Sequence, residues 1–154
     1  AGPVEGLIEL RQIRSGEKYE DFYDDLNALD AKVVANSAGQ SLIRVNTDAE
    51  RGNWAQSWQW SVDDQRVFAA AFAELMQNFK SVETYVALGS INQGVSKHGE
   101  SHYIYSNQGS FADNLNGGPQ NQPEFEAFEK FGNTIAPIST FLGTRTEVTI
   151  KTWQ

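Results

Sequence analysis

Both histidines of the protein lie within five residues, on either side of a carboxylate. The segment reads His98-Gly99-Glu100-Ser101-His102. If it is extended, His98, Glu100 and His102 point to one face, because successive side chains of a strand alternate between faces. Two imidazoles and one carboxylate form the ligand set of a zinc or non-haem iron(II) site with open positions. The spacing predicts a metal site at these three residues and makes His98 and His102 candidate catalytic residues.

Two other interpretations of this segment stay open. Side chains on one face of a strand lie about 7 Å apart, so three ligands from one straight strand need a bend to reach a single ion. Without a metal, the segment is an exposed polar hairpin, or one histidine transfers a proton near neutral pH. No organic cofactor is expected, and a divalent metal is the alternative.

Three of the four tryptophans alternate along one short stretch. As a strand, the stretch places Trp54, Gln56, Trp58 and Trp60 on one face and small polar residues on the other. Aromatic rings supply flat walls for a small ligand or platforms for sugar rings. The alternative is ordinary core packing beneath helices. Gln56 needs a partner if it is buried there, which favours a wet pocket or a subunit interface at part of this face.

The predicted ligand site combines this face with aromatic and basic residues from other strands. Tyr103 and Tyr105 add rings to Trp54 and Trp58. Arg44 lies between two apolar residues of a predicted strand. An inward arginine can bind a carboxylate or phosphate through two parallel hydrogen bonds, whereas an outward one pairs with a neighbouring acid.

Composition excludes several classes of protein. The net charge is −8, with 12 basic and 20 acidic residues. Nucleic acids and anionic membrane surfaces attract clustered Lys and Arg, so neither is an expected partner. There are no cysteines, which excludes disulfides, thiolate catalysis and zinc–thiolate sites. No apolar run reaches the ~18 residues of a transmembrane helix.

Hydrophobic periodicity predicts the elements that position these residues. Apolar stripes at helical spacing indicate three helices, and alternating patterns indicate six strands. Residues 47–52 are expected to form a hairpin loop between the second and third strands. Residues 107–122, rich in Gly, Asn and Gln, are expected to form a long loop, which in a compact domain is usually functional or disordered. The helices are expected near 19–33, 67–79 and 125–135, and the strands near 7–14, 41–46, 54–60, 82–88, 102–105 and 146–153.

Through residue 90 this order is β-α-β-β-α-β, which resembles the ferredoxin-like fold. The lengths and the aromatic strand are similar to the dimeric α+β barrel superfamily, which includes antibiotic-biosynthesis-type monooxygenases. The resemblance covers residues 4–90 and carries no catalytic residue with it. The expected fold is a single α+β domain over residues 1–154. It has an antiparallel sheet, helices on one face, and a C-terminal β-α-β extension over residues 91–154.

The resemblance implies a homodimeric α+β barrel protein that binds a small molecule, and a cofactor-independent oxygenase- or lyase-like enzyme within that class. Apolar side chains on both sheet faces favour the dimer, because an exposed apolar face normally marks an interface. The alternative is a non-enzymatic secreted or periplasmic module that binds a glycan or a protein. The chain begins Ala1-Gly2-Pro3. This beginning fits a mature secreted or periplasmic protein, or a remnant of tag removal on a cytoplasmic one.

Overall fold

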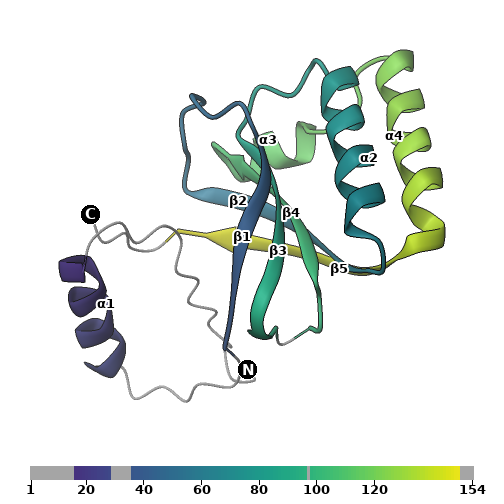
Figure 1. Ribbon diagram of the computed structural model, residues 1–154. Coiled ribbons are helices and arrows are strands. Elements are labelled where there is room, and N and C mark those ends of the chain that lie inside the picture. Colours follow the sequence, from purple (N-terminus) through teal and green to yellow (C-terminus); the bar gives the residue numbers. More distant parts are fainter. Residues whose placement is uncertain (1–15, 29–35, 97, 150–154) are drawn as a thin grey trace, which may run out of the picture. The chain divides into compact units, whose positions relative to one another are not determined.

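The computed structural model describes residues 16–28, 36–96 and 98–149. These residues belong to two compact parts (Figure 1). Of the first part the structure describes one helix, α1 (Gly16–Ala28), so the helix expected near 19–33 is confirmed as far as Ala28, and its residues 29–33 lie outside the described residues. The strand predicted over residues 7–14 lies outside the described residues.

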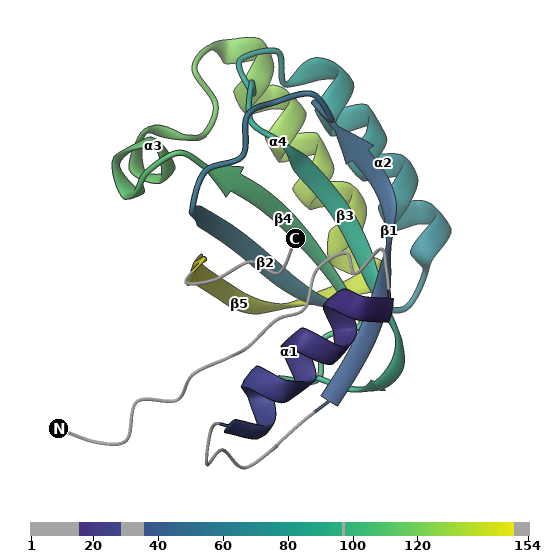
Figure 2. The same cartoon turned by 90° about the vertical axis from the view of Figure 1, so that its left-hand side faces the viewer.

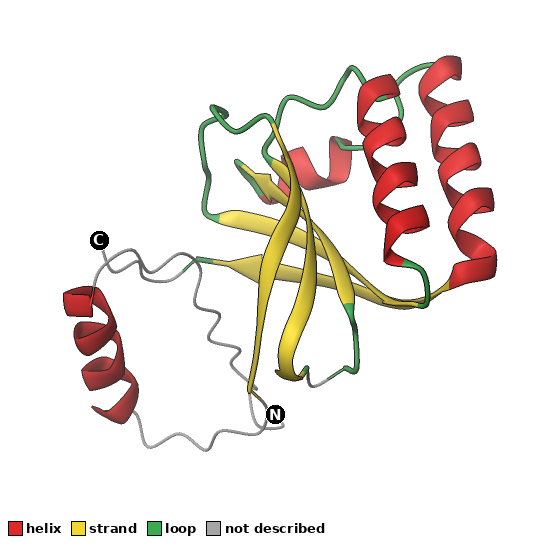
Figure 3. Cartoon of the chain, viewed as in Figure 1, coloured by secondary structure: helices red, strands yellow, loops and turns green. Residues whose placement is uncertain are grey.

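The second part contains a five-stranded sheet in which every neighbouring pair is antiparallel. This confirms the α+β class and the antiparallel sheet (Figure 3). The spatial order is β1-β3-β4-β2-β5. The strands are β1 (Asn36–Val45), β2 (Trp54–Val62), β3 (Val86–Val95), β4 (His102–Gln108) and β5 (Ser139–Val148).

Two long helices lie side by side on one face of the sheet (Figure 1). They are α2 (Gln65–Asn78) and α4 (Gln122–Ile135), and the latter runs into a single 3-10 turn. Asp64 caps α2 by accepting hydrogen bonds from two backbone N–H groups of the first turn, and Asn121 caps α4 by accepting one, from Glu124. No helix in the described part of the chain is both long and apolar enough to span a membrane.

The main core fills the space between these helices and the sheet. Phe68 and Phe72 of α2 are completely buried, as is Leu88 of β3. Burying a side chain of this size contributes about 1.5–3 kcal/mol, so these residues hold the helices on the sheet. Other members of the same cluster are Trp60, Leu75, Phe79, Val86, Ile104, Phe131 and Ile135.

A buried carboxylate fixes the start of α4. Glu124 accepts hydrogen bonds from the backbone N–H and the hydroxyl of Ser81, at 3.0 and 2.7 Å, and from the N–H of Gln120 at 3.1 Å. Burial alone raises the pKa of Glu124, but these hydrogen bonds outweigh it and hold the pKa below its ordinary value. The charged carboxylate therefore ties α4 to the connection between α2 and β3.

The spatial order of the strands differs from their order along the chain. Strand β4 lies between β3 and β2, and β5 lies beside β2, so the C-terminal residues complete the sheet. From β2 to β5 the elements follow along the chain as β2-α2-β3-β4-α3-α4-β5, with the 3-10 turn between α4 and β5. The physical reason for the spatial order is the crossover through α2: β2 and β3 are parallel and leave one position between them, which β4 fills.

The segment before β2 is also not a hairpin loop. Strand β1 pairs with β3 and not with β2. Asn46, with φ of 52°, donates hydrogen bonds from Nδ2 to the carbonyl oxygens of Val82 and Thr84, both at 2.9 Å. The left-handed residue and its amide turn the chain toward the start of β3, after which residues 47–53 cross to β2.

The segment predicted as a long loop is partly regular. Asn107 and Gln108 are buried at the end of β4, and a short helix, α3 (Phe111–Asn116), follows. Only residues 117–121 connect this helix to α4.

Candidate functional site

The predicted ligand residues are divided between the two faces of the sheet. Trp58 lies opposite Ile104, whose side chain belongs to the core under α2 and α4; we call this the helix face. Tyr105 belongs to a separate cluster on the opposite face, which we call the second face. Tyr103 packs against that cluster, and Arg44 lies opposite one of its members, Ala87.

Trp54 and Trp58 therefore share the helix face, whereas Arg44, Tyr103 and Tyr105 share the second face. The structure therefore does not bring these five residues together on one face of the sheet. The physical cause is the register of β2 against β4, which places Trp58 opposite Ile104 and Gln59 opposite Tyr103.

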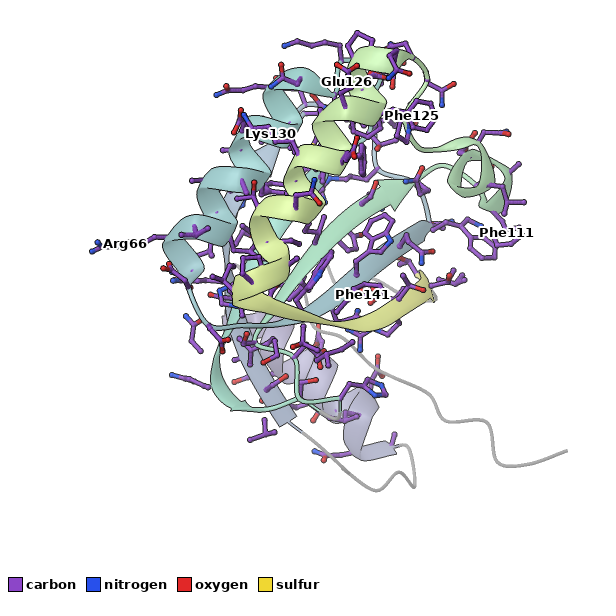
Figure 4. The ribbon with its side chains drawn as sticks, turned by 90° about the vertical axis from the view of Figure 1, so that its right-hand side faces the viewer. Arg66, Phe111, Phe125, Glu126, Lys130 and Phe141 are labelled. Atoms are coloured by element: carbon purple, nitrogen blue, oxygen red, sulfur yellow. The ribbon has the colours of Figure 1, made fainter. Side chains whose placement is uncertain are left out.

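On the helix face, the helices cover the end of β2 at Trp60, which belongs to the core, but they leave part of β5 exposed. Figure 4 shows Phe111 on α3 and Phe141 on β5, with strands between α3 and α4 that no helix overlies. Trp54 contacts Phe111 with ring centroids 5.8 Å apart, and Trp60 contacts Phe141 at 5.2 Å. We call this region the aromatic surface; it consists of Trp54, Gln56, Trp58, Phe111, Phe141, Thr144 and Thr146.

The aromatic surface combines exposed rings with polar groups. Phe111 and Phe141 are 49% and 54% exposed, and Trp54 and Trp58 are half-buried. Gln56 is buried and accepts a hydrogen bond from the Thr146 hydroxyl at 2.9 Å. Trp60 is a core residue, as the alternative interpretation expected. Trp54 and Trp58 are less buried: Trp58 packs against this core, and Thr144 lies opposite it on β5.

The second face carries a buried polar array. Gln59 donates a hydrogen bond from Nε2 to the Ser57 hydroxyl at 2.6 Å, and both residues are buried. On β5, Nε of Arg145 lies 3.2 Å from Oε1 of Glu147, and its Nη2 lies 3.8 Å from Oε1 of Glu100. Sequence reasoning missed Arg145 and Glu147, although opposite charges two residues apart in the last strand were a signal that they share one face.

Both ring nitrogens of His102 are hydrogen-bonded within the protein. Its Nε2 lies 2.9 Å from Oε1 of Gln65 at the start of α2, and its Nδ1 lies 2.9 Å from the Ser101 hydroxyl. The Ser101 oxygen in turn accepts the N–H of Val62 at 2.9 Å. An amide oxygen can only accept, so Nε2 carries a proton; burial lowers the pKa of His102 and favours the neutral ring, in which the Ser101 hydroxyl donates to Nδ1. His102 thus joins α2, β2 and β4 as a neutral imidazole.

The three predicted metal ligands are separated in space. Gly99 has φ of 75° and β4 begins only at His102, so the segment is not one extended strand. His98 is exposed, whereas Glu100 is buried against Arg145 and the Ser96 hydroxyl. Among the described residues, no three His, Cys, Asp or Glu side chains are grouped to hold a metal ion. The chain does bend at Gly99, but the bend does not bring the three side chains together around one ion.

Burial lowers the pKa of His102 below 6.5, and this predicts a pH dependence of stability. As pH falls from 6.5 toward the lowered value, the unfolded chain binds a proton that the folded chain does not. The free energy of unfolding should therefore fall over this range, by less than about 1.4 kcal/mol per pH unit. Urea unfolding between pH 7 and 5 measures it. His102→Gln should flatten this slope and His98→Gln should retain it; loss of the slope in His98→Gln alone would contradict the assignment.

A groove of about 300 Å³ lies between the outer surfaces of α2 and α4. It is bordered by the ion pair between Lys130, labelled in Figure 4, and Glu74. None of the predicted ligand or catalytic residues lines it. Lys130 and Glu74 pair with each other, and Glu126 accepts a hydrogen bond from Gln122, so the groove is a weaker candidate than the aromatic surface.

Comparison of the chain with known protein families, with curated proteins and with solved structures finds no match.

Proposed function

We propose that this protein binds a small carbohydrate or a similarly flat, hydroxyl-rich ligand on the aromatic surface, as a binding module without a catalytic step. The observation that carries the proposal is the pair of half-buried tryptophans, Trp54 and Trp58, on the helix face of β2, beside the exposed rings of Phe111 and Phe141. This develops the glycan-binding alternative given by the sequence.

The chemistry of the aromatic surface fits such a ligand. A sugar ring has an apolar side made of C–H groups and a rim of hydroxyls. Flat rings cover the apolar side, while a few placed polar groups fix the orientation. Here the exposed side chains of Thr144 and Thr146 lie directly across the strand pair from Trp58 and Gln56. The Thr144 hydroxyl can both donate and accept, and the Thr146 hydroxyl, whose proton is donated to Gln56, can still accept from a sugar hydroxyl.

We also propose new boundaries for the ferredoxin-like unit, which the sequence pattern placed over residues 4–90. We assign the ferredoxin-like unit to residues 54–148, with β1 as an added edge strand. This assignment is supported by the order β2-α2-β3-β4-α4-β5, ignoring the short α3, and by β4 lying between the parallel strands β2 and β3. The aromatic surface then lies on the helix-bearing face of that unit, at the edge formed by β2 and β5.

The binding proposal predicts a large effect of Trp54→Ala. Removing one stacking ring should weaken binding about tenfold, which corresponds to ~1.4 kcal/mol. A panel of soluble neutral oligosaccharides is titrated by calorimetry, and the best binder is tested against each variant. Phe111→Ala should weaken binding in the same direction, because Phe111 contacts the Trp54 ring. No heat with any oligosaccharide, for a wild type that is folded, would sink the carbohydrate proposal.

The matched control is Tyr103→Phe, which removes one hydroxyl from the second face. A ligand on the aromatic surface should bind this variant as it binds the wild type. A ligand lost in Tyr103→Phe and retained in Trp54→Ala would instead favour a second candidate: a small-molecule α+β barrel protein with a cofactor-independent lyase- or oxygenase-like activity. The observation that favours this candidate is Arg145 beside two carboxylates, with Ser57 and Gln59 buried on the same face.

A further inference from the structure

Strand β5 is the outermost strand on its side of the sheet (Figure 2). The N–H of Thr149 donates to the carbonyl of Asn53 at 2.8 Å, so Thr149 directs its backbone groups toward β2. In an antiparallel pair this direction alternates with each residue. The backbone N–H and C=O groups of Thr144, Thr146 and Val148 therefore point away from the sheet.

This outer edge is accessible. The side chains of Thr144 and Thr146 are exposed, and Val148 is 51% exposed. Within residues 36–96 and 98–149, no strand lies on the outer side of β5. A free edge of unpaired backbone groups is a template for another strand. A register irregularity at the pair of Gln59 with Gly143, where φ of Gly143 is 130°, limits the regular edge to the residues that follow.

The charges on β5 select one partner and one register. We infer that β5 pairs with β5 of a second copy of this chain, antiparallel, about a two-fold axis at Thr146. Outward-facing residues must pair with outward-facing residues, so the axis can lie only at 144, 145, 146, 147 or 148. An axis at Arg145 or Glu147 places like charges directly opposite each other, which is destabilising. Only the axis at Thr146 places Arg145 opposite Glu147 of the second copy, and does so twice.

This register also forms the most contacts that the edge permits. Thr146 exchanges both backbone hydrogen bonds with its copy, and Thr144 and Val148 exchange theirs with each other across the axis. The two sheets become one ten-stranded sheet, with both aromatic surfaces on the same side. The homodimer expected from the sequence is thereby assigned to a sheet edge, and the assignment does not depend on what the aromatic surface binds.

Single cysteines in the same strand test the register, because the protein has none of its own. In the inferred dimer the two Cα atoms of residue 146 lie about 5.5 Å apart, within the range of a disulfide. Those of residue 144 lie about 13 Å apart and those of residue 140 about 40 Å apart. Under mild oxidation Thr146→Cys should give a covalent dimer on a non-reducing gel, whereas Thr144→Cys and Thr140→Cys should stay largely monomeric.

Sedimentation equilibrium of the unmodified protein supplies the second measurement. At micromolar concentration the wild type should sediment at twice its 17.1 kDa mass. Thr144→Pro removes an outward N–H that the fold does not use, and should shift the protein toward monomer. A wild-type monomer at all concentrations would overturn the inference. So would a wild-type dimer that is cross-linked through residue 144 or 140 and not through residue 146.

Discussion

Phe68→Ala should destabilise the folded sheet by about 3–5 kcal/mol. Phe68 is completely buried, and its ring centroid lies 5.4 Å from that of Trp60, 5.8 Å from Phe131 and 6.1 Å from His102. It is therefore the side chain through which α2 contacts β2, β4 and α4 together. Its removal leaves a cavity that four separate elements would have to close, and a close-packed interior relaxes only partly.

Urea unfolding measures this effect, and Val67→Ala is its matched control. Val67 is the preceding residue of α2 and is 36% exposed, so its truncation should change stability by no more than about 0.5 kcal/mol. Equal losses in the two variants would contradict the central position of Phe68. A loss below about 1 kcal/mol in Phe68→Ala would show that the core closes around the missing ring.

Asn107→Ala should cost about 2–4 kcal/mol, because one buried amide satisfies several backbone groups. Its Oδ1 accepts the N–H of Gly52 at 2.7 Å, and its Nδ2 donates to the carbonyls of Gly52 and Trp54 at 3.1 and 3.3 Å. The Nδ2 also lies 3.2 Å from the hydroxyl of Tyr105. The amide thus fixes the entry to β2, from which Trp54 reaches the aromatic surface.

Two variants separate this network from a general effect of removing an asparagine. Asn92 is exposed on the neighbouring strand β3, where its side-chain oxygen accepts only the Ser90 hydroxyl. Asn92→Ala should therefore change urea stability by no more than about 0.5 kcal/mol. Asn107→Asp keeps the acceptor for Gly52 but places a carboxylate oxygen against two carbonyls. It should therefore lower the free energy of unfolding at least as much as Asn107→Ala. A stable Asn107→Asp protein would count against the geometry.

Local pattern was sufficient for most elements. The stripe from Val67 to Phe79 predicted α2 because one face of a helix repeats every three to four residues. The alternation around Trp58 predicted β2 because a strand repeats every two. The strand predicted over residues 82–88 starts too early, because β3 begins at Val86 and continues to Val95.

Neighbouring strands, by contrast, are chosen by contacts between residues far apart in the chain. Sequence order suggested that β1 pairs with β2, but β1 pairs with β3 instead. The amide of Asn46, bound to two carbonyls at residues 82 and 84, turns the chain there. The division of the ligand residues between two faces has the same cause. The face of each side chain depends on the register of β2 against β4, and a change of one residue in register would move every side chain to the other face. Neither Tyr103 nor Trp58 by itself reveals that register.

The sequence by itself determined the class of the fold, the positions of α2 and α4 and the absence of thiol chemistry. It also placed aromatic rings on a single face of β2, because these properties follow from residue types and short-range periodicity. The tertiary structure decided which face each candidate residue occupies. It separated His98 from His102, because the positive φ of Gly99 turns the chain between them and Gln65, thirty-seven residues earlier, takes up the imidazole. It also brought Arg145 beside Glu100, because pairing of β2 with both β4 and β5 joins segments that the sequence holds far apart.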